Sequence, residues 1–237
     1  MPLYLYAVTD ADHPLPVDGA TGIGASPAPL RAVRTARVAA VVSEAPTQLR
    51  AKRRDLIAHQ NVLLMLGAAG AVVPLRFGTL APDDGAVRRA LADQESLFTD
   101  RLREVEDRVE FNVKALQDED TALRDVLRDS AEARRLSALT RDGAGTHDDQ
   151  VSLGTVVAAG VEALQEQHAQ DIARRLEPLA HRVAAGDPTG EVFLNLSLLI
   201  ERGQADAFAA SVGEVAESLG HGLELRVTGP LPPYSFV

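Results

Sequence analysis

The sequence predicts an α+β protein of two domains, and three observations support this class. The first half of the 237 residues reads as β-β-α-β-α-β from its apolar spacing, an order related to the ferredoxin-like arrangement. The second half begins with long helical patterns, and it closes with a strand, a helix and a strand. We therefore expect a ferredoxin-like α/β sandwich at residues 1–116. At residues 117–237 we expect an α+β domain with a long helical hairpin, a β-α-β unit and an extended tail.

The first domain is expected to contain four strands and two helices. Short apolar runs predict the strands, and apolar residues recurring every three or four positions predict the helices. Pro74 cannot donate a ladder hydrogen bond, so its strand is expected at a sheet edge or interrupted. Strict alternation places Glu110 on the polar face of the last strand. The expected strands are 3–8, 37–43 (central), 71–77 and 108–115, the helices are 47–66 and about 82–105, and residues 10–29 form a loop.

The second domain is expected to open with two helices and to end in a proline-rich tail. The polar, Gly-rich run 141–150 is expected to be a mobile linker between these helices. The tail, GPLPPYSFV at residues 229–237, is not expected to be helical, because proline lacks a backbone N–H and restricts the residue before it. We expect a rigid extended strip. The expected helices are 121–139, 153–184 and 204–219, and the strands are 192–200 and 223–227.

Composition limits the classes of partner. The 24 basic and 34 acidic residues give a net charge of −10, which disfavours binding to nucleic acid or to an anionic membrane. The absence of cysteine excludes disulfides and thiolate metal sites, and it fits a reducing cytoplasm. We identify neither a signal peptide nor an apolar run long enough to span a bilayer.

The titratable residues do not form a recognisable catalytic set. His59 follows Asp55 by four positions, a spacing that allows an acid–base pair but is more typical of an ordinary helix-surface contact. The run from His147 to Asp149 lacks the further ligands that a metal site needs, so a solvated linker is the better interpretation. No dinucleotide-binding or Walker loop is found. We therefore expect no catalytic, cofactor-binding or metal-binding residues, and enzyme is the weaker functional class.

Four stretches together resemble one family, the gas vesicle protein F/L family of gas vesicle assembly proteins. The stretches are Leu3–Tyr6 (LYLY), Val73–Thr79 (VPLRFGT), Glu110–Lys114 (EFNVK) and Gly229–Phe236 (GPLPPYSF). Their order and spacing extend the resemblance over essentially the whole chain. These motifs do not separate an F-type from an L-type member.

The resemblance implies a non-enzymatic accessory or minor structural protein of gas vesicle assembly, located in the cytoplasm and at the gas vesicle. Its implied partners are the major gas vesicle shell protein, a small and very hydrophobic GvpA-like subunit, and other gas vesicle accessory proteins. Neither nucleic acid nor membrane is an expected partner, and no cofactor is expected. The alternative is a small-molecule-binding or enzymatic ferredoxin-like domain, which predicts a deep pocket with convergent polar groups.

Two surfaces are candidates for partner binding, because edge strands and extended tails suit pairing with another chain. One is the Pro74 strand, with Arg76 and Phe77. The other is the tail, with Pro232, Pro233, Tyr234 and Phe236. For both, a structural role remains open. The tail aromatics could instead pack across the sheet of the second domain, and Arg76 could tie down a neighbouring loop.

Overall fold

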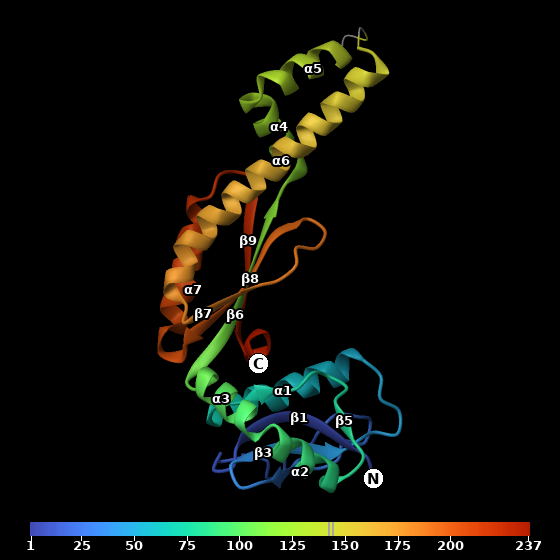
Figure 1. Ribbon diagram of the computed structural model, residues 1–237, viewed down its shortest axis with the longest axis vertical. Helices are drawn as coiled ribbons and strands as arrows, with labels where there is room; N and C mark the ends of the chain where they lie inside the picture. Colours follow the sequence, from blue (N-terminus) through green and yellow to red (C-terminus); the bar gives the residue numbers. More distant parts are fainter. Residues whose placement is uncertain (142, 144) are drawn as a thin grey trace. The chain divides into compact units, whose positions relative to one another are not determined.

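The computed structural model describes residues 1–141, 143 and 145–237, and its helices and strands confirm the α+β class. The helices are α1 (Arg53–Ala69), α2 (Asp84–Asp93), α3 (Glu95–Val105), α4 (Glu119–Asp129), α5 (Ala131–Arg141), α6 (His147–Leu176) and α7 (Ala205–Ser218) (Figure 1). The strands are β1 (Leu3–Asp10), β2 (Arg31–Arg34), β3 (Val38–Glu44), β4 (Val73–Pro74), β5 (Leu80–Ala81), β6 (Arg108–Gln117), β7 (Arg182–Ala185), β8 (Val192–Glu201) and β9 (Leu223–Leu231). Among the described residues, no helix is both long and apolar enough to cross a membrane.

The internal contacts divide the chain into two compact units. Unit 1 comprises residues 1–111, 199–203 and 229–237, and unit 2 comprises residues 112–198 and 204–228. We expected the domain boundary after residue 116, and the first segment of unit 1 ends five residues earlier, at Phe111. The tail, which we expected in the second domain, has its contacts in unit 1.

Unit 1 is built on a sheet of order β2-β3-β1-β4, in which β5 also pairs with β1. Strand β3 lies between β2 and β1 and is buried along almost its whole length, as a central strand should be. Strand β4 lies at the edge, where the sequence placed Pro74. Helix α1 covers one face and helices α2 and α3 cover the other, so that apolar clusters fill both sides.

A β-bulge in β1 determines which side chains face α1. The pairing of β1 with β3 is antiparallel from Leu3 to Asp10, and its register shifts between Leu5 and Ala7. Tyr4 and Tyr6 lie with the α1 cluster by ordinary alternation. The extra residue of the bulge places Ala7 in the same cluster and Val8 with Leu3 in the α2 and α3 cluster.

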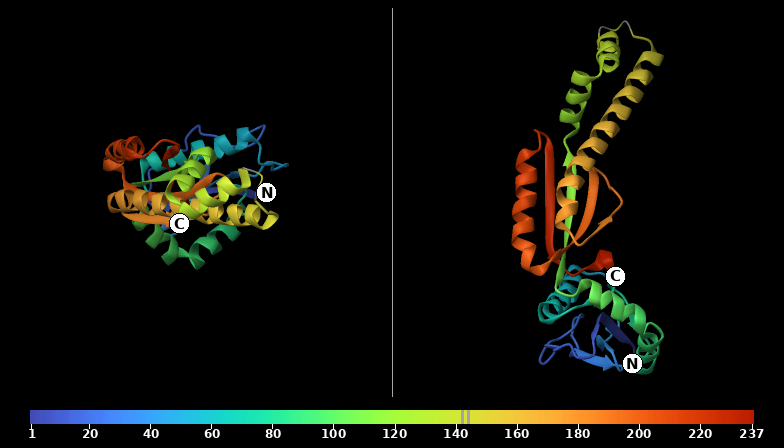
Figure 2. Two further views of the ribbon diagram at one scale, coloured as in Figure 1. Left: turned by 90° about the horizontal axis from the view of Figure 1, so that it is seen from above. Right: turned by 60° about the vertical axis from the view of Figure 1, so that its left-hand side comes forward.

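Unit 2 carries a helical hairpin formed by α4 and α5 against α6, as both views show (Figures 1 and 2). Ser130 explains why one expected helix is two, because it ends α4 and its side chain accepts a hydrogen bond from the Ala133 N–H at the start of α5. Helix α6 starts at His147 with a Thr146–Asp149 capping box, six residues before the expected start. It ends at Leu176 because Pro178 follows, and residues 182–185 form β7 instead of the helix we expected.

Other expected elements differ in extent or in partner. The strand at 108–115, counted in the first sheet, belongs as β6 to a four-stranded sheet of order β7-β8-β6-β9. The expected β-α-β order is present as β8, α7 and β9. Helix α1 starts six residues late, the helix after Pro82 is divided at Gln94, and β2 and β5 were not expected. Of the expected linker 141–150, Asp142 and Ala144 lie outside the described residues.

The α4–α6 contact generates a stability prediction. A Cβ added at Gly160 of α6 would lie 2.7 Å from Cγ1 of Val126, whereas one at Gly154 of the same helix meets nothing within 4 Å. Gly154→Ala should raise the free energy of unfolding by about 0.5–1 kcal/mol through helix propensity. Gly160→Ala should have the same gain in helix propensity, but overpacking against Val126 should lower its free energy of unfolding by about 1–3 kcal/mol. Thermal unfolding of the two variants measures the difference, and equal melting temperatures would contradict the close approach.

Candidate functional site

His59 of α1 is the centre of a buried polar cluster in unit 1. Its side chain is 3% exposed, and both ring nitrogens have partners. Nδ1 lies 3.0 Å from the Tyr4 hydroxyl of β1. Nε2 lies 3.1 Å from the Leu75 carbonyl oxygen and 3.0 Å from the Tyr234 hydroxyl of the tail. One imidazole thus joins a strand, an edge loop and the C-terminal tail.

The partners of His59 determine its tautomer. The Leu75 carbonyl can only accept, so Nε2 carries the proton and Nδ1 accepts from the Tyr4 O–H. The Tyr4 oxygen in turn accepts from the Gly78 N–H at 3.2 Å. Burial lowers the pKa of His59 below its ordinary value, against the opposing effect of the bond to the Leu75 carbonyl. His59 is therefore a neutral structural group.

The pair of His59 with Asp55, considered from the sequence, is not formed. The Asp55 carboxylate accepts instead from the Gly24 N–H at 3.1 Å and from the Arg54 guanidinium at 2.9 Å. His59 also lies among aromatic rings. Tyr6 stacks on the imidazole with centroids 5.5 Å apart, and burial raises the pKa of the Tyr6 hydroxyl. These contacts leave His59 without the free base nitrogen that proton transfer to a substrate requires.

The expected edge strand 71–77 turns away from the sheet after Leu75, and this positions Phe77. The Leu75 N–H still bonds to the Tyr6 carbonyl, but residues 76–79 form a turn closed by the Thr79 N–H and the Arg76 carbonyl at 3.1 Å. Gly78 has φ +96, a conformation that L side chains rarely adopt. Phe77 consequently packs inward, with ring centroids 5.8 Å from His59.

Arg76 points the other way and is exposed. Within the described part of the chain, its guanidinium has neither a hydrogen-bond partner nor an ion-pair partner. The structural role considered for Arg76, tying down a neighbouring loop, is not seen. Of the two residues expected at this edge, Arg76 is accessible and Phe77 is packed.

The tail packs along unit 1. Pro232, Pro233 and Phe236 are buried, with Phe236 2% exposed, whereas Tyr234 remains 40% exposed. Strand β9 extends to Leu231, and residues 234–236 form a short 3₁₀ turn, so the extended strip we expected ends before Tyr234. The sequence also favoured closure of the second domain by these aromatics, but their contacts lie in unit 1.

Glu110 holds the tail end. The Ser235 N–H and Oγ donate to its two carboxylate oxygens at 2.9 and 2.7 Å, and the Arg101 guanidinium donates to the Phe236 carbonyl at 3.3 Å. Glu110 is 4% exposed, although strand alternation assigned it to the polar face. The tail supplies the hydrogen bonds that allow this carboxylate to be buried.

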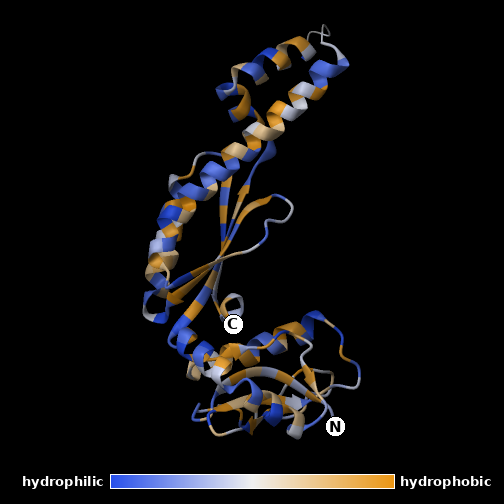
Figure 3. Ribbon diagram, viewed as in Figure 1, coloured by the Kyte–Doolittle hydropathy of each residue, from blue (hydrophilic) through white to orange (hydrophobic). Residues whose placement is uncertain are grey.

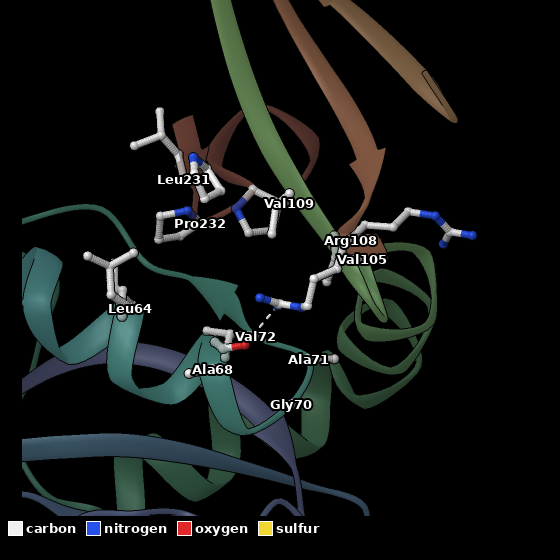
Figure 4. Close-up of a pocket in the computed structure, with 15 residues that line it drawn as sticks. Leu64, Ala68, Gly70, Ala71, Val72, Val105, Arg108, Val109, Leu231 and Pro232 are labelled. Carbon is white, nitrogen blue, oxygen red and sulfur yellow. Dashed lines mark hydrogen bonds between the residues drawn. The ribbon is translucent and has the colours of Figure 1, made fainter. Parts of the chain in front are cut away.

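Beside the tail lies an apolar cavity of about 100 Å³, formed within unit 1 (Figure 4). Leu64 and Ala68 of α1 face Leu231 and Pro232 of the tail, with Val109 of β6 nearby. Arg202 also lines the cavity, and its guanidinium donates to the Gly67 carbonyl at 2.8 Å. The lining is therefore chiefly aliphatic.

Several contributors to the site were not identified from the sequence. His59, Glu110 and Ser235 are ordinary residues in their own segments, and their roles arise from partners up to 175 positions away. The motifs themselves were the available signal. Glu110 lies in EFNVK and Ser235 in GPLPPYSF, and Tyr4, Leu75 and Tyr234 of the motifs all contact His59. Among the described residues, no group of three or more histidines and carboxylates could hold a metal ion.

Comparison with known proteins decides the family. The model of the gas vesicle synthesis proteins GvpL/GvpF matches residues 2–237. The chain belongs to this family. Gas vesicle protein F of Streptomyces sp. strain CB03234 is 44% identical, covering 100% of both chains. Gas vesicle protein L of the same strain is 32% identical over 98% of this chain and 91% of the relative.

Two solved structures share the GvpL/GvpF fold. The crystal structure of GvpF from Microcystis aeruginosa has a TM-score of 0.81 at 23% identity, covering 99% of this chain and 98% of that one. GvpF from Anabaena sp. PCC7120 has a TM-score of 0.85 at 23% identity, covering 99% and 97%. The resemblance stated from the motifs is confirmed, and a role in gas vesicle assembly follows from the family.

The burial of His59 makes a pH prediction. An unfolded histidine has a pKa of about 6.5, and that of folded His59 is lower. As the pH falls through the unfolded pKa of about 6.5, His59 of the unfolded state binds a proton that the native state does not bind. The free energy of unfolding should therefore fall as the solution is acidified. His13, whose pKa burial also lowers, should contribute in the same direction. Urea unfolding between pH 7.5 and 5.5 measures the slope.

His59→Gln should be less stable at pH 7.5 and should show a shallower pH slope. His181→Gln, at an exposed position, is the control and should keep the wild-type slope. Equal slopes for wild type and His59→Gln would contradict the buried neutral state.

The docked tail makes a second prediction for this site. Removal of the residues after Gly229 should cost about 3 kcal/mol or more, because it exposes the Phe236 site and leaves the buried Glu110 unsatisfied. Ser235→Ala should cost about 1–2 kcal/mol, and Ser152→Ala on the exposed side of α6 almost nothing. Chemical unfolding gives these values. An unchanged midpoint after truncation would mean that the tail is not packed.

Proposed function

We propose that this chain is a non-enzymatic accessory or minor structural protein of gas vesicle assembly, binding the small hydrophobic shell protein and other gas vesicle proteins. It acts in the cytoplasm and at the gas vesicle. The observation that carries the proposal is the match to GvpL/GvpF proteins over residues 2–237. The identity of 44% to a gas vesicle protein F, against 32% to the L protein of the same strain, favours an F-type role.

In the proposed mechanism, this protein covers an apolar surface of the shell subunit. A shell subunit with a large apolar face aggregates in water unless a partner covers that face. Among the site residues, Arg76 and the exposed part of Tyr234 are accessible to such a partner. The buried Pro232, Pro233 and Phe236 act by holding the tail in place, and Phe77 by packing beside His59. The direct contacts are thus assigned to Arg76 and Tyr234.

The alternative, a small-molecule-binding or enzymatic domain, has less support. Its pocket should measure about 300–1,000 Å³ and contain convergent polar groups. The apolar cavity beside the tail measures about 100 Å³, and its Arg202 guanidinium is engaged by the Gly67 carbonyl. Larger hollows of about 540 and 560 Å³ lie beside Asp55 and beside Glu201 and are open to solvent. The Asp55 carboxylate already accepts from Arg54 and from the Gly24 N–H.

Co-expression with the shell protein tests the proposal. We expect the shell protein to remain in the supernatant and to co-purify with this chain, because its apolar face is covered. Ultracentrifugation followed by affinity purification measures both. No association, even with the other accessory proteins present, would contradict the proposal.

A charge reversal tests the assigned contact. Arg76→Glu should lower the amount of co-purified shell protein several-fold. Arg89→Glu, an exposed reversal on α2, is the matched control and should have no effect.

A further inference from the structure

Helix α1 is apolar on two opposite sides. Its inner side packs against the sheet through Val62, Leu63 and Leu66, which are all buried. Ile57 and Leu64 are seven residues apart and so share the opposite side, where they are 47% and 43% exposed. We call Ile57, Leu64 and Ala68, with Leu56 on the flank, the outer face of α1. A helix that is apolar on both sides is typical of a buried position.

The outer face of α1 continues into the cavity beside the tail. Leu64, Gly67 and Ala68 line this cavity from α1, and Leu231 and Pro232 line it from the tail (Figure 4). Its volume of about 100 Å³ is smaller than the roughly 150 Å³ cavity that accepts benzene. The cavity therefore fits one aliphatic side chain rather than an aromatic ring.

The N-terminal end of the outer face is cationic. Arg50, Lys52 and Arg53 are exposed and, within the described chain, have no ion-pair partner. Cations at a helix N-terminus are opposed by the helix dipole. Asp55, the acidic residue of the first turn, is occupied by Arg54 and the Gly24 N–H. The colouring by hydropathy shows α1 hydrophilic at its start, with a second hydrophilic stretch in its middle and apolar residues after it (Figure 3).

This positive end is unusual in a chain with a net charge of −10. Three unpaired cations, placed where the helix itself disfavours them, are best explained by an acidic partner. From Arg53 to Gly67 the helix rises about 21 Å, so one ligand helix of four turns or more can reach both the cations and the cavity.

We propose that the outer face of α1 and the adjoining cavity bind an amphipathic helix of a partner protein. One aliphatic side chain of that helix enters the cavity, and acidic residues at one of its ends lie over Arg50, Lys52 and Arg53. This inference deepens the proposed function, because it names the chemistry that a partner must present. It rests on the proposed function for the statement that the partner is a gas vesicle protein.

Three synthetic peptides of 18 residues test the surface, with binding measured by fluorescence anisotropy on the full chain. The first has a leucine stripe and glutamates at one end, the second has lysines in place of the glutamates, and the third has alanines in place of the leucines. We expect the first peptide to bind at least about tenfold more tightly than the third, since one buried aliphatic side chain is worth about that factor. We expect it to bind several-fold more tightly than the second, because lysines at that end would face Arg50, Lys52 and Arg53. Equal affinities for all three peptides would overturn the proposal.

Two variants locate the site. Gly67→Leu places a side chain at the cavity, where an added Cβ meets nothing within 4 Å, and leucine favours the helix. It should weaken the first peptide about tenfold, while Gly213→Leu, an equally open helical glycine of α7, leaves binding unchanged. Arg53→Glu should weaken binding about threefold, and Arg89→Glu should not. Wild-type affinity in Gly67→Leu would place the site elsewhere and refute the inference.

The same variants separate this inference from the proposed function. If the shell protein co-purifies equally with wild type and Gly67→Leu, and the peptides do not bind, the inference fails and the assembly role stands. If the first peptide binds selectively and Gly67→Leu abolishes binding, but shell protein never associates, the surface stands and the shell partner is wrong.

Discussion

A buried neutral histidine with partners from three segments is the constraint on which much of unit 1 depends. An unpaired polar atom in an apolar interior costs about 1–3 kcal/mol, so the buried His59 depends on Tyr4 at Nδ1 and on Leu75 and Tyr234, which share the one proton of Nε2. Each partner comes from a different part of the chain. The three are therefore held together by one side chain whose hydrogen bonds cannot be made by any of the segments alone.

The edge loop and the tail perform related tasks around this histidine. Residues 75–79 present the Leu75 carbonyl and the Gly78 N–H inward and leave the Arg76 side chain outside. The tail similarly buries Phe236, satisfies Glu110 and leaves part of Tyr234 exposed. In both segments, internal hydrogen bonding places specific groups on the surface. Within each of these two motifs, a residue that is buried lies next to a residue that is exposed. A structural or a partner-binding role is therefore assigned to single residues and not to a whole motif.

The sequence predicted what local patterns control. The central strand β3 and the edge position of Pro74 were identified because an apolar run and a missing N–H act locally. The end of α6 was missed although Pro178 was visible, because apolar periodicity was given more weight than the helix breaker. Glu110 and His59 could not be placed, since strand alternation and helix spacing give no information about partners such as Ser235 and Tyr234, 125 and 175 residues away.

Unit 1 contains residues 1–111 and residues 229–237, which are synthesised at different times. Its interior is therefore completed in a fixed order. A ribosome delivers the sheet, α1 and His59 long before it delivers Tyr234 and Ser235. During translation the nascent first segment holds Glu110 and His59 without their tail partners, and the surface that Phe236 will cover stays open. Residues 229–237 thus close an interior that residues 1–111 began, so unit 1 is complete only after residues 229–237 have been synthesised.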